Sequence, residues 1–443
     1  MLGIILLLTA LFLYYKPIYR YISYFLYISF MIGYGGGFGI WTDAVLGMKN
    51  KDLAIVYTFI ISLYLISQKK FFLPRFEFIK WYKIFLVFLL CSVLFSYIYY
   101  GFSFYQILQG GRDFLLIFSF PILIRMNPFE LQKLLKLLLF VTIVTSILYI
   151  LQIVVGRPLM PYSGEPSVDP TVGLIRMYNS PALLDFFLIF TFVKPEYFGK
   201  RVILLRILFF IALICTFGRT GIFSTMISVL LAIAFLGKAS KLIKTIVIIG
   251  VLFIPFIGMI SSRFEKGGTS EDLSAITSGN FQDYSMEDGG TMTYRFAWVY
   301  ERFDYLIDRP IWEQIFGLGL ISDSQFIVQK MYNFRLGLVD LETQVPTQLS
   351  TPDIAYGNIL TKMGICGGFI YLMFLIKMAI FLYKNRTYNF LLLISTAQFI
   401  MLFIGSLSGS ALSYPKNLVM FFISVGTLSY VNNNFILAKV KNH

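Results

Sequence analysis

Histidine is almost absent from this chain of 443 residues, because the single histidine is the last residue, His443. A histidine general base, a Ser-His-Asp triad and a histidine-based metal site are therefore excluded from the rest of the sequence. The sequence also contains no Asp-x-Asp pair and no Walker-type phosphate loop. We therefore expect no metal ion, no cofactor and no direct use of ATP.

Charge is scarce as well, at 14% of residues, whereas 58% are hydrophobic and 18% aromatic. A soluble domain is about 25% charged and about 45–50% apolar. Apolar runs that could each cross a bilayer recur from end to end. They lie near 21–40, 53–67, 84–99, 105–124, 137–155, 181–193, 202–217, 220–236, 245–260, 356–383, 388–404 and 417–434, and 1–15 would make a thirteenth. That first run has no basic start and no small-residue cleavage site, so we expect a retained span.

The net charge of +14 does not indicate nucleic-acid binding, because the basic residues gather in alternate connections between the apolar runs. These residues are Lys69, Lys70, Arg75, Lys80, Lys83, Arg125, Lys133, Lys136, Lys194, Lys200, Arg201, Arg206, Lys238, Lys241, Lys244, Lys384 and Arg386. By the positive-inside rule these connections and the C-terminus are cytoplasmic. The connections 156–180 and 261–355 are then extracytoplasmic.

We therefore expect an all-α polytopic protein of the cytoplasmic (inner) membrane, with about 12–13 transmembrane helices and one large extracytoplasmic loop that contains helices. The expected parts are an N-terminal transmembrane bundle (1–260), the large loop (261–355) and C-terminal transmembrane helices (356–443). The three cysteines lie in apolar runs without a Cys-x-x-Cys spacing, so they are expected to be buried hydrophobic residues.

Within the large loop, residues 291–308 have a helical pattern that ends before Pro310. Arg295, Arg302 and Arg309 follow one another at seven-residue intervals, so they share one stripe of this helix. None of them has a carboxylate three or four residues away within the helix. Two interpretations are open: arginines that are solvated or paired elsewhere in the loop, and an anion site at the membrane surface.

Ionisable residues inside apolar runs are candidates for function, because their burial in a membrane is costly. Arg112 and Asp113 lie within one run, and adjacent helical residues diverge, so each needs its own partner. We expect this pair to tie helices together. Asp185 and Lys362 lie within other runs, and Arg219 lies between two runs on the expected outer side, where it could meet a lipid phosphate.

Five segments carry a resemblance to a known family. In chain order they are GLIRMYNSP (173–181), TFGRTGIFS (216–224), YRFAW (294–298), RPIWEQIFGLG (309–319) and PDIAYGNILTKMGICGG (352–368). Their order, spacing and expected topology over about 173–370 resemble the O-antigen ligase and Wzy-type polysaccharide polymerase superfamily. Ligases of the family place a catalytic histidine eleven residues before the position of Gly364, and Asp353 stands there in this chain. That departure favours a polymerase.

The resemblance implies a GT-C-like fold and a glycosyltransferase that joins repeat units carried on undecaprenyl pyrophosphate. The implied partners are the lipid-linked donor and acceptor glycans, the bilayer, a chain-length regulator and a flippase. Arg176, Arg219 and Arg295 are expected to stabilise the negative charge of the departing pyrophosphate. The expected base is Asp353, and Glu165 and Asp169 are the next candidates. Other expected substrate contacts are Arg302, Arg309, Tyr178 and Tyr356. An O-antigen ligase and a lipid-linked oligosaccharide flippase are the alternatives, and neighbouring genes would discriminate between them.

Overall fold

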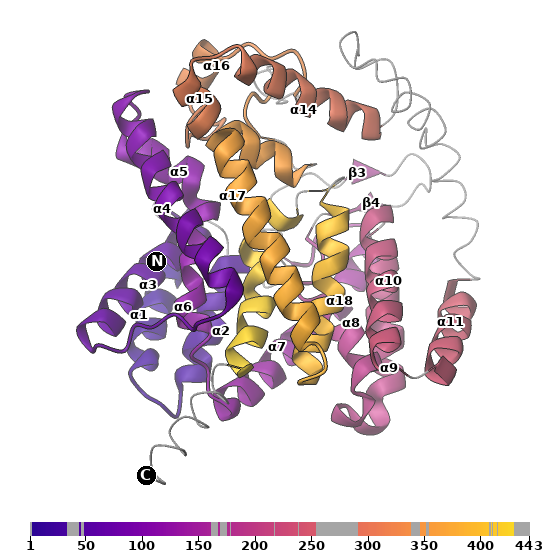
Figure 1. The fold of residues 1–443 in the computed structure, drawn as a ribbon. Coiled ribbons are helices and arrows are strands. Elements are labelled where there is room, and N and C mark those ends of the chain that lie inside the picture. Colours follow the sequence, from indigo (N-terminus) through magenta and orange to yellow (C-terminus); the bar gives the residue numbers. More distant parts are fainter. Residues whose placement is uncertain are drawn as a thin grey trace.

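The computed structural model describes residues 2–32, 44–45, 48–160, 167–168, 175–177, 179–216, 218–237, 239–253, 291–337, 346–350, 354–406, 409, 411–413 and 415–428 (Figure 1). Within these ranges the regular secondary structure is helical, apart from two antiparallel ladders with two residues in each strand. The first ladder pairs β1 (Ala44–Val45) with β2 (Met48–Lys49), and the second pairs β3 (Ser167–Val168) with β4 (Ile175–Arg176).

Every apolar run of the sequence contains at least one helix, which confirms the all-α prediction. The helices that precede the large loop are α1 (Leu2–Tyr14), α2 (Arg20–Ile32), α3 (Asn50–Ser67), α4 (Glu77–Ile98), α5 (Phe104–Leu115), α6 (Phe120–Leu123), α7 (Pro128–Val155), α8 (Leu184–Val193), α9 (Val202–Ile214), α10 (Arg219–Phe235) and α11 (Ala239–Phe253). After the loop come α17 (Ala355–Asn385), α18 (Phe390–Gly405) and a last helix, Val419–Leu428. The run 105–124 is not one regular helix, because a 3-10 turn at Leu116–Ser119 separates α5 from α6.

By length and composition, four of the described helices could cross a membrane: α3, α4, α7 and α17. The outward face of α4 illustrates why such a helix suits a membrane. This helix buries Tyr82, Phe85 and Leu89 but leaves Leu90 and Leu94 52% and 58% exposed. A helix that is apolar all round needs an apolar surrounding, and lipid supplies one. The larger number of spans expected from the apolar runs stays a prediction.

Three shorter helices occupy the middle of the bundle. In α2, all ten residues from Ser23 to Ile32 are buried, and in α8 nine of ten residues are buried. The last helix, Val419–Leu428, is buried along almost its whole length. The described parts of these three helices are therefore packed among other helices of the bundle.

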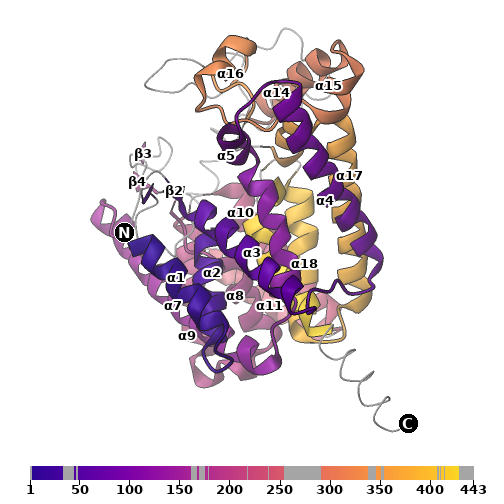
Figure 2. The ribbon, with the colours of Figure 1, turned by 90° about the vertical axis from the view of Figure 1, so that its left-hand side faces the viewer.

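The cap, defined as residues 291–337 and 346–350, covers one end of the bundle (Figures 1 and 2). It contains α14 (Thr291–Ile307), α15 (Ile311–Phe316) and α16 (Phe326–Met331). The helix predicted over 291–308 is thereby confirmed, and Pro310 separates it from α15. The rest of the loop predicted at 261–355 lies outside the described residues, and its extracytoplasmic position stays a prediction.

The cap is attached at a break in α17. Gly364 has φ 70° and ψ −175°, which interrupts the helix. The turn at Gly317 fits into this break so closely that a Cβ on Gly317 would lie 2.4 Å from the Gly364 nitrogen. Beside it, the Leu318 N–H donates to the Thr361 carbonyl at 2.8 Å. The cap and α17 therefore hold each other through backbone contacts.

The basic connections meet at the end of the bundle opposite the cap, because α17 begins under the cap and ends at Asn385 (Figure 1). Lys384 pairs with Glu77 at 3.4 Å, and Arg125 donates to the Lys70 carbonyl. Connections far apart in the sequence thus share one end of the bundle, as the charge pattern predicts. Which side of a membrane this end faces stays a prediction.

Candidate functional site

A cavity of about 360 Å³ lies at the cap-facing end of the bundle. Its walls are the segment 180–185 at the start of α8, the start of α10 and the end of α18, together with the 3-10 turns Ala411–Ser413 and Pro415–Leu418. The Gly409 carbonyl, on the same wall, accepts a hydrogen bond from Ala355 N–H at 3.1 Å. The start of α17 is therefore next to this cavity.

Asp185 is the acidic residue in the cavity wall. It lies in the first turn of α8, half-buried, and its carboxylate accepts a hydrogen bond from the Thr225 hydroxyl of α10. The sequence singles out Asp185 as an ionisable residue in an apolar run but does not connect it with the predicted site. The structure supplies that connection, since α8 and α10 line the cavity together.

The backbone immediately before Asp185 is strained. Leu183 has φ 59° and ψ 14°, a left-handed conformation that is an outlier for a leucine. Such a conformation costs about 1–3 kcal/mol and tends to occur at functional sites. Leu183 lines the cavity, and the Ala182 carbonyl beside it accepts from Thr142 of α7 at 3.2 Å. Packing against α7 thus holds a strained turn at the cavity wall.

The segments that contain Arg176 and Arg219 are brought together by α7. The buried Tyr149 hydroxyl donates to the Met177 carbonyl at 2.8 Å and lies 3.4 Å from the Cys215 carbonyl oxygen. One turn further along α7, the buried Gln152 side chain donates to Asn179 at 2.6 Å. Arg176 ends β4 and Arg219 begins α10, but their side chains lie outside the described residues. The structure therefore brings the two backbone segments to the same end of the bundle.

Arg295 reaches this end through α14. Trp298 and Val299, one turn further along the helix, contact Gly357 of α17, where a Cβ would lie 2.8 Å from the Trp298 ring. Arg295 is half-buried and lies on the same stripe of α14 as these two residues, so it is on the side of α14 that packs on α17. The indole of Trp298 is buried, which makes it part of the cap interior.

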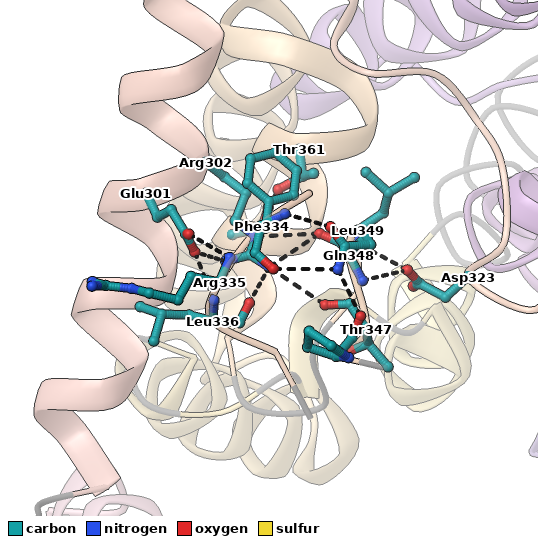
Figure 3. Close-up of polar contacts among 12 residues, drawn as sticks. Glu301, Arg302, Asp323, Phe334, Arg335, Leu336, Thr347, Gln348, Leu349 and Thr361 are labelled. Carbon is teal, nitrogen blue, oxygen red and sulfur yellow. Dashed lines mark hydrogen bonds and ion pairs between the residues drawn. The ribbon is translucent and has the colours of Figure 1, made fainter. Parts of the chain in front are cut away.

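Arg302 lies in the interior of the cap, with 1% exposure (Figure 3). Its guanidinium carbon lies over the rings of Trp298 and Phe334, at 4.1 and 4.5 Å from their centroids. It pairs with Glu301 at 2.6 Å. Burial lowers the pKa of Arg302 to about 10, because the charged form loses its hydration.

The remaining donors of Arg302 are used within the cap. They bond to the carbonyls of Leu336, Thr347 and Gln348, and the Gln348 contacts are 3.2 Å long. Nearby, the N–H groups of Gln348 and Leu349 both donate to Asp323 at 2.8 Å (Figure 3). These contacts are those of the first interpretation, an arginine paired elsewhere in the loop. Its assignment as a substrate contact is left with no support from the geometry.

Arg309 joins the cap to the top of α4. Its guanidinium binds Glu313 through two nitrogens, at 2.8 and 3.2 Å, and the Tyr99 hydroxyl donates to the same carboxylate at 3.0 Å. The hydrogen bond to Glu313 raises the pKa of Arg309 above its ordinary value. Arg309 is therefore also paired within the loop, through a partner beyond the end of α14 that the helical pattern does not include.

Tyr356 lies in the first turn of α17, and its hydroxyl is 3.4 Å from the Phe403 carbonyl oxygen of α18. It connects two helices that border the cavity. Four further predicted residues lie outside the described part of the chain: Asp353, Glu165, Asp169 and Tyr178. Asp353 immediately precedes Ile354, the first described residue before α17.

The adjacent charges Arg112 and Asp113 tie α5 to α3, as predicted. Lys51 pairs with Asp113 at 2.5 Å, and Asp52 pairs with Arg112 at 3.6 Å. Lys51 and Asp52 belong to the first turn of α3, so the pair lies level with that helix end and not in the middle of a span. Lys362 of α17 lies close enough to Asp323 and Asp113 for an electrostatic interaction with both carboxylates.

No group of three His, Cys, Asp or Glu side chains that could hold a metal ion occurs among the described residues. In comparisons with known proteins, no family model matches the chain, and no curated protein matches it. The residues around the cavity are therefore the basis for a functional assignment.

Proposed function

We propose that this chain is a polysaccharide polymerase that joins undecaprenyl-pyrophosphate-linked repeat units at the outer face of the cytoplasmic membrane. The observation that carries the proposal is the convergence of separate segments at the end of the bundle where the first cavity lies: Pro181 and Gly221 line that cavity, and the start of α17 is bonded to Gly409 in its wall. The segments around Arg176 and Arg219 meet through Tyr149, and α14 with Arg295 packs on the start of α17. These are segments on which the family resemblance rests, and they are up to about 180 residues apart in the sequence.

In the proposed reaction the acceptor hydroxyl loses its proton to a carboxylate, and its oxygen bonds to the anomeric carbon of the donor. The bond from that carbon to the pyrophosphate oxygen breaks, so the lipid pyrophosphate leaves as an anion. Guanidinium groups suit this anion because they bind phosphate oxygens through two nitrogens. Arg176, Arg219 and Arg295 are the proposed cations, and Asp353 is the proposed base. Asp185 is a second candidate base, because it lines the cavity.

The proposal includes a membrane topology. The cap is extracytoplasmic, the basic end of the bundle and the C-terminus are cytoplasmic, and the chain crosses the membrane about 12–13 times. What supports this arrangement is that the cap and the basic connections lie at opposite ends of the bundle. The lipid-linked substrates would then reach the cavity from the outer leaflet.

Deletion of the gene in its own host tests the proposal against its alternatives. Loss of a polymerase leaves single repeat units on the finished glycan, whereas loss of a ligase leaves full-length polymer on the lipid carrier. Loss of a flippase leaves lipid-linked units at the cytoplasmic face. We expect single repeat units, which immunoblotting and lipid extraction would show. Either other pattern would exclude the polymerase.

Reconstitution of the purified chain with extracted lipid-linked repeat units tests the site. We expect Arg219→Lys to insert and fold but to elongate poorly, because lysine cannot bind phosphate through two nitrogens. Lys200→Arg is a matched control, since Lys200 is exposed in the turn Gly199–Arg201. Chain lengths equal to wild type for Arg219→Lys would remove that residue from the proposed site.

A further inference from the structure

A second cavity, of about 440 Å³, lies at the basic end of the bundle. The first turns of α7 and α18 form two of its walls, and the others are the segment after α8 and Thr427 of the last helix. Its size is within the range of about 300–1,000 Å³ that is usual for small-molecule pockets. It is separate from the cavity at the cap, because α17 begins beside the one and ends beside the other.

The walls of this second cavity are apolar, with one charge at the edge. Leu131 and Leu135 of α7 face Phe390 and Leu391 of α18. Among the described residues that line the cavity, Lys194 is the only charged one. Its side chain is exposed, and Nζ lies 4.8 Å from the centroid of the Phe390 ring. The cavity therefore combines an apolar interior with a positive charge at its mouth.

One of the two helices that start here adds to the positive potential at the cavity. α18 presents its N-terminal end, which carries a partial positive charge, whereas the N-terminal end of α7 already holds the carboxylate of Glu130, which accepts from the Asn127 N–H. Asn127 caps α7 by accepting from the Glu130 N–H, and Asn389 caps α18 by accepting from the Leu392 N–H. Because these N–H groups are already bonded, the end of α18 favours a nearby anion only through its dipole, and Lys194 is the group that can contact the anion directly.

We propose that this cavity binds an anionic membrane phospholipid, with one acyl chain between α7 and α18 and the phosphate beside Lys194. An apolar wall gives no affinity to a soluble anion, and a neutral lipid would gain nothing from the lysine. Basic pockets between helices of membrane proteins bind anionic headgroups in this way. The proposal is independent of glycosyl transfer, because it rests only on the basic end of the bundle.

Lipid binding to the purified full-length chain is the test. Phosphatidylglycerol and phosphatidylcholine with identical acyl chains are titrated by native mass spectrometry, with inorganic phosphate as a competitor. We expect phosphatidylglycerol to bind more tightly and Lys194→Gln to weaken it roughly fivefold, the factor for about 1 kcal/mol per lysine. Gln132→Trp, an exposed lining position, should weaken both lipids by blocking the cavity.

Lys200→Gln is the matched control, since this exposed lysine lies six residues away and does not line the cavity. It should bind phosphatidylglycerol as the wild type does, and thermal midpoints of all variants should show that they fold. Equal binding of the two lipids, an unchanged Lys194→Gln variant or an equal effect of Lys200→Gln would each overturn the proposal. Competition by millimolar phosphate as strong as by the lipid would identify a soluble anion instead.

Discussion

At the scale of single residues, an experiment can decide which of two carboxylates, Asp353 or Asp185, is the base of the proposed reaction. We expect Asp353→Asn to lower turnover about 10²–10⁴-fold, the usual contribution of a general base, and to leave donor binding nearly unchanged. Asparagine keeps any helix-capping role of Asp353 and removes only the basicity. Rates of chain elongation and donor affinity would be measured together, with Asp185→Asn as the comparison. Normal polymer from Asp353→Asn with a slow Asp185→Asn would move the base to Asp185.

Arg302 is expected to support stability and not chemistry. Replacement by lysine keeps a charge but loses the planar fork that reaches the carbonyls of Leu336 and Gln348. Buried polar groups without partners cost about 1–3 kcal/mol each, so Arg302→Lys should lower the midpoint of thermal unfolding by several degrees. Arg309→Lys is the control, because Arg309 is 42% exposed and its pair is partly screened. Equal shifts for both variants would contradict the interior role of Arg302.

The sequence predicts that three arginines share one side of a helix, but it does not predict which of them are buried or which groups they contact. Spacing alone puts Arg295, Arg302 and Arg309 on one side of the predicted helix. In the structure Arg302 is buried and Arg295 half-buried, whereas Arg309 lies beyond the end of α14 and is 42% exposed. The carbonyl groups that Arg302 binds are 34 to 46 residues away in the chain, so no local pattern could have indicated them. The sequence predicts Asp185 to be an ionisable residue within an apolar run, but its partner Thr225 comes from another helix. Long-range pairing is the missing information in both cases.

At the scale of elements, the break in α17 is the position most sensitive to a small change. A Cβ at Gly364 would lie 2.4 Å from the Ile315 carbonyl oxygen, and its φ of 70° disfavours any residue with a side chain. We expect Gly364→Ala to loosen the cap, which limited proteolysis would detect as cleavage between α14 and α16. Gly250→Ala in α11 is the matched control, because nothing lies within 4 Å of its Cβ position. It should leave the digestion pattern unchanged, and cleavage in both variants would refute a local effect.

Helices were predicted well because hydropathy and helical period are local properties of the sequence. The predicted course of a helix is wrong where tertiary contacts determine the backbone conformation. Examples are the 3-10 turn after α5 and the break at Gly364. The apolar run 356–383 gives no sign of that break. The break exists because the Gly317 turn occupies the place of a side chain. The cavity at the cap is likewise a product of packing between segments distant in sequence.

At the scale of the whole molecule, the charge asymmetry predicts which end of the bundle is outside. A reporter fused after Gly279, in the predicted loop, should show alkaline phosphatase activity and no β-galactosidase activity. The same reporters fused after Lys69, in a basic connection, should give the reverse. Identical behaviour at the two positions would contradict opposite placement of the cap and the basic end. Opposite sides for the two fusion sites would also require an odd number of spans between them.

The two ion pairs between α3 and α5 restrict which residues related proteins can carry at these four positions. Lys51 with Asp113 and Asp52 with Arg112 form two bonds from two dipeptides, so one substitution leaves a single half-buried charge without its partner. Reversing both dipeptides together restores both bonds with opposite polarity. The four positions should therefore behave as one inherited unit. Related proteins would carry both dipeptides in this order, both reversed, or both replaced by uncharged residues, and mixed combinations should be rare.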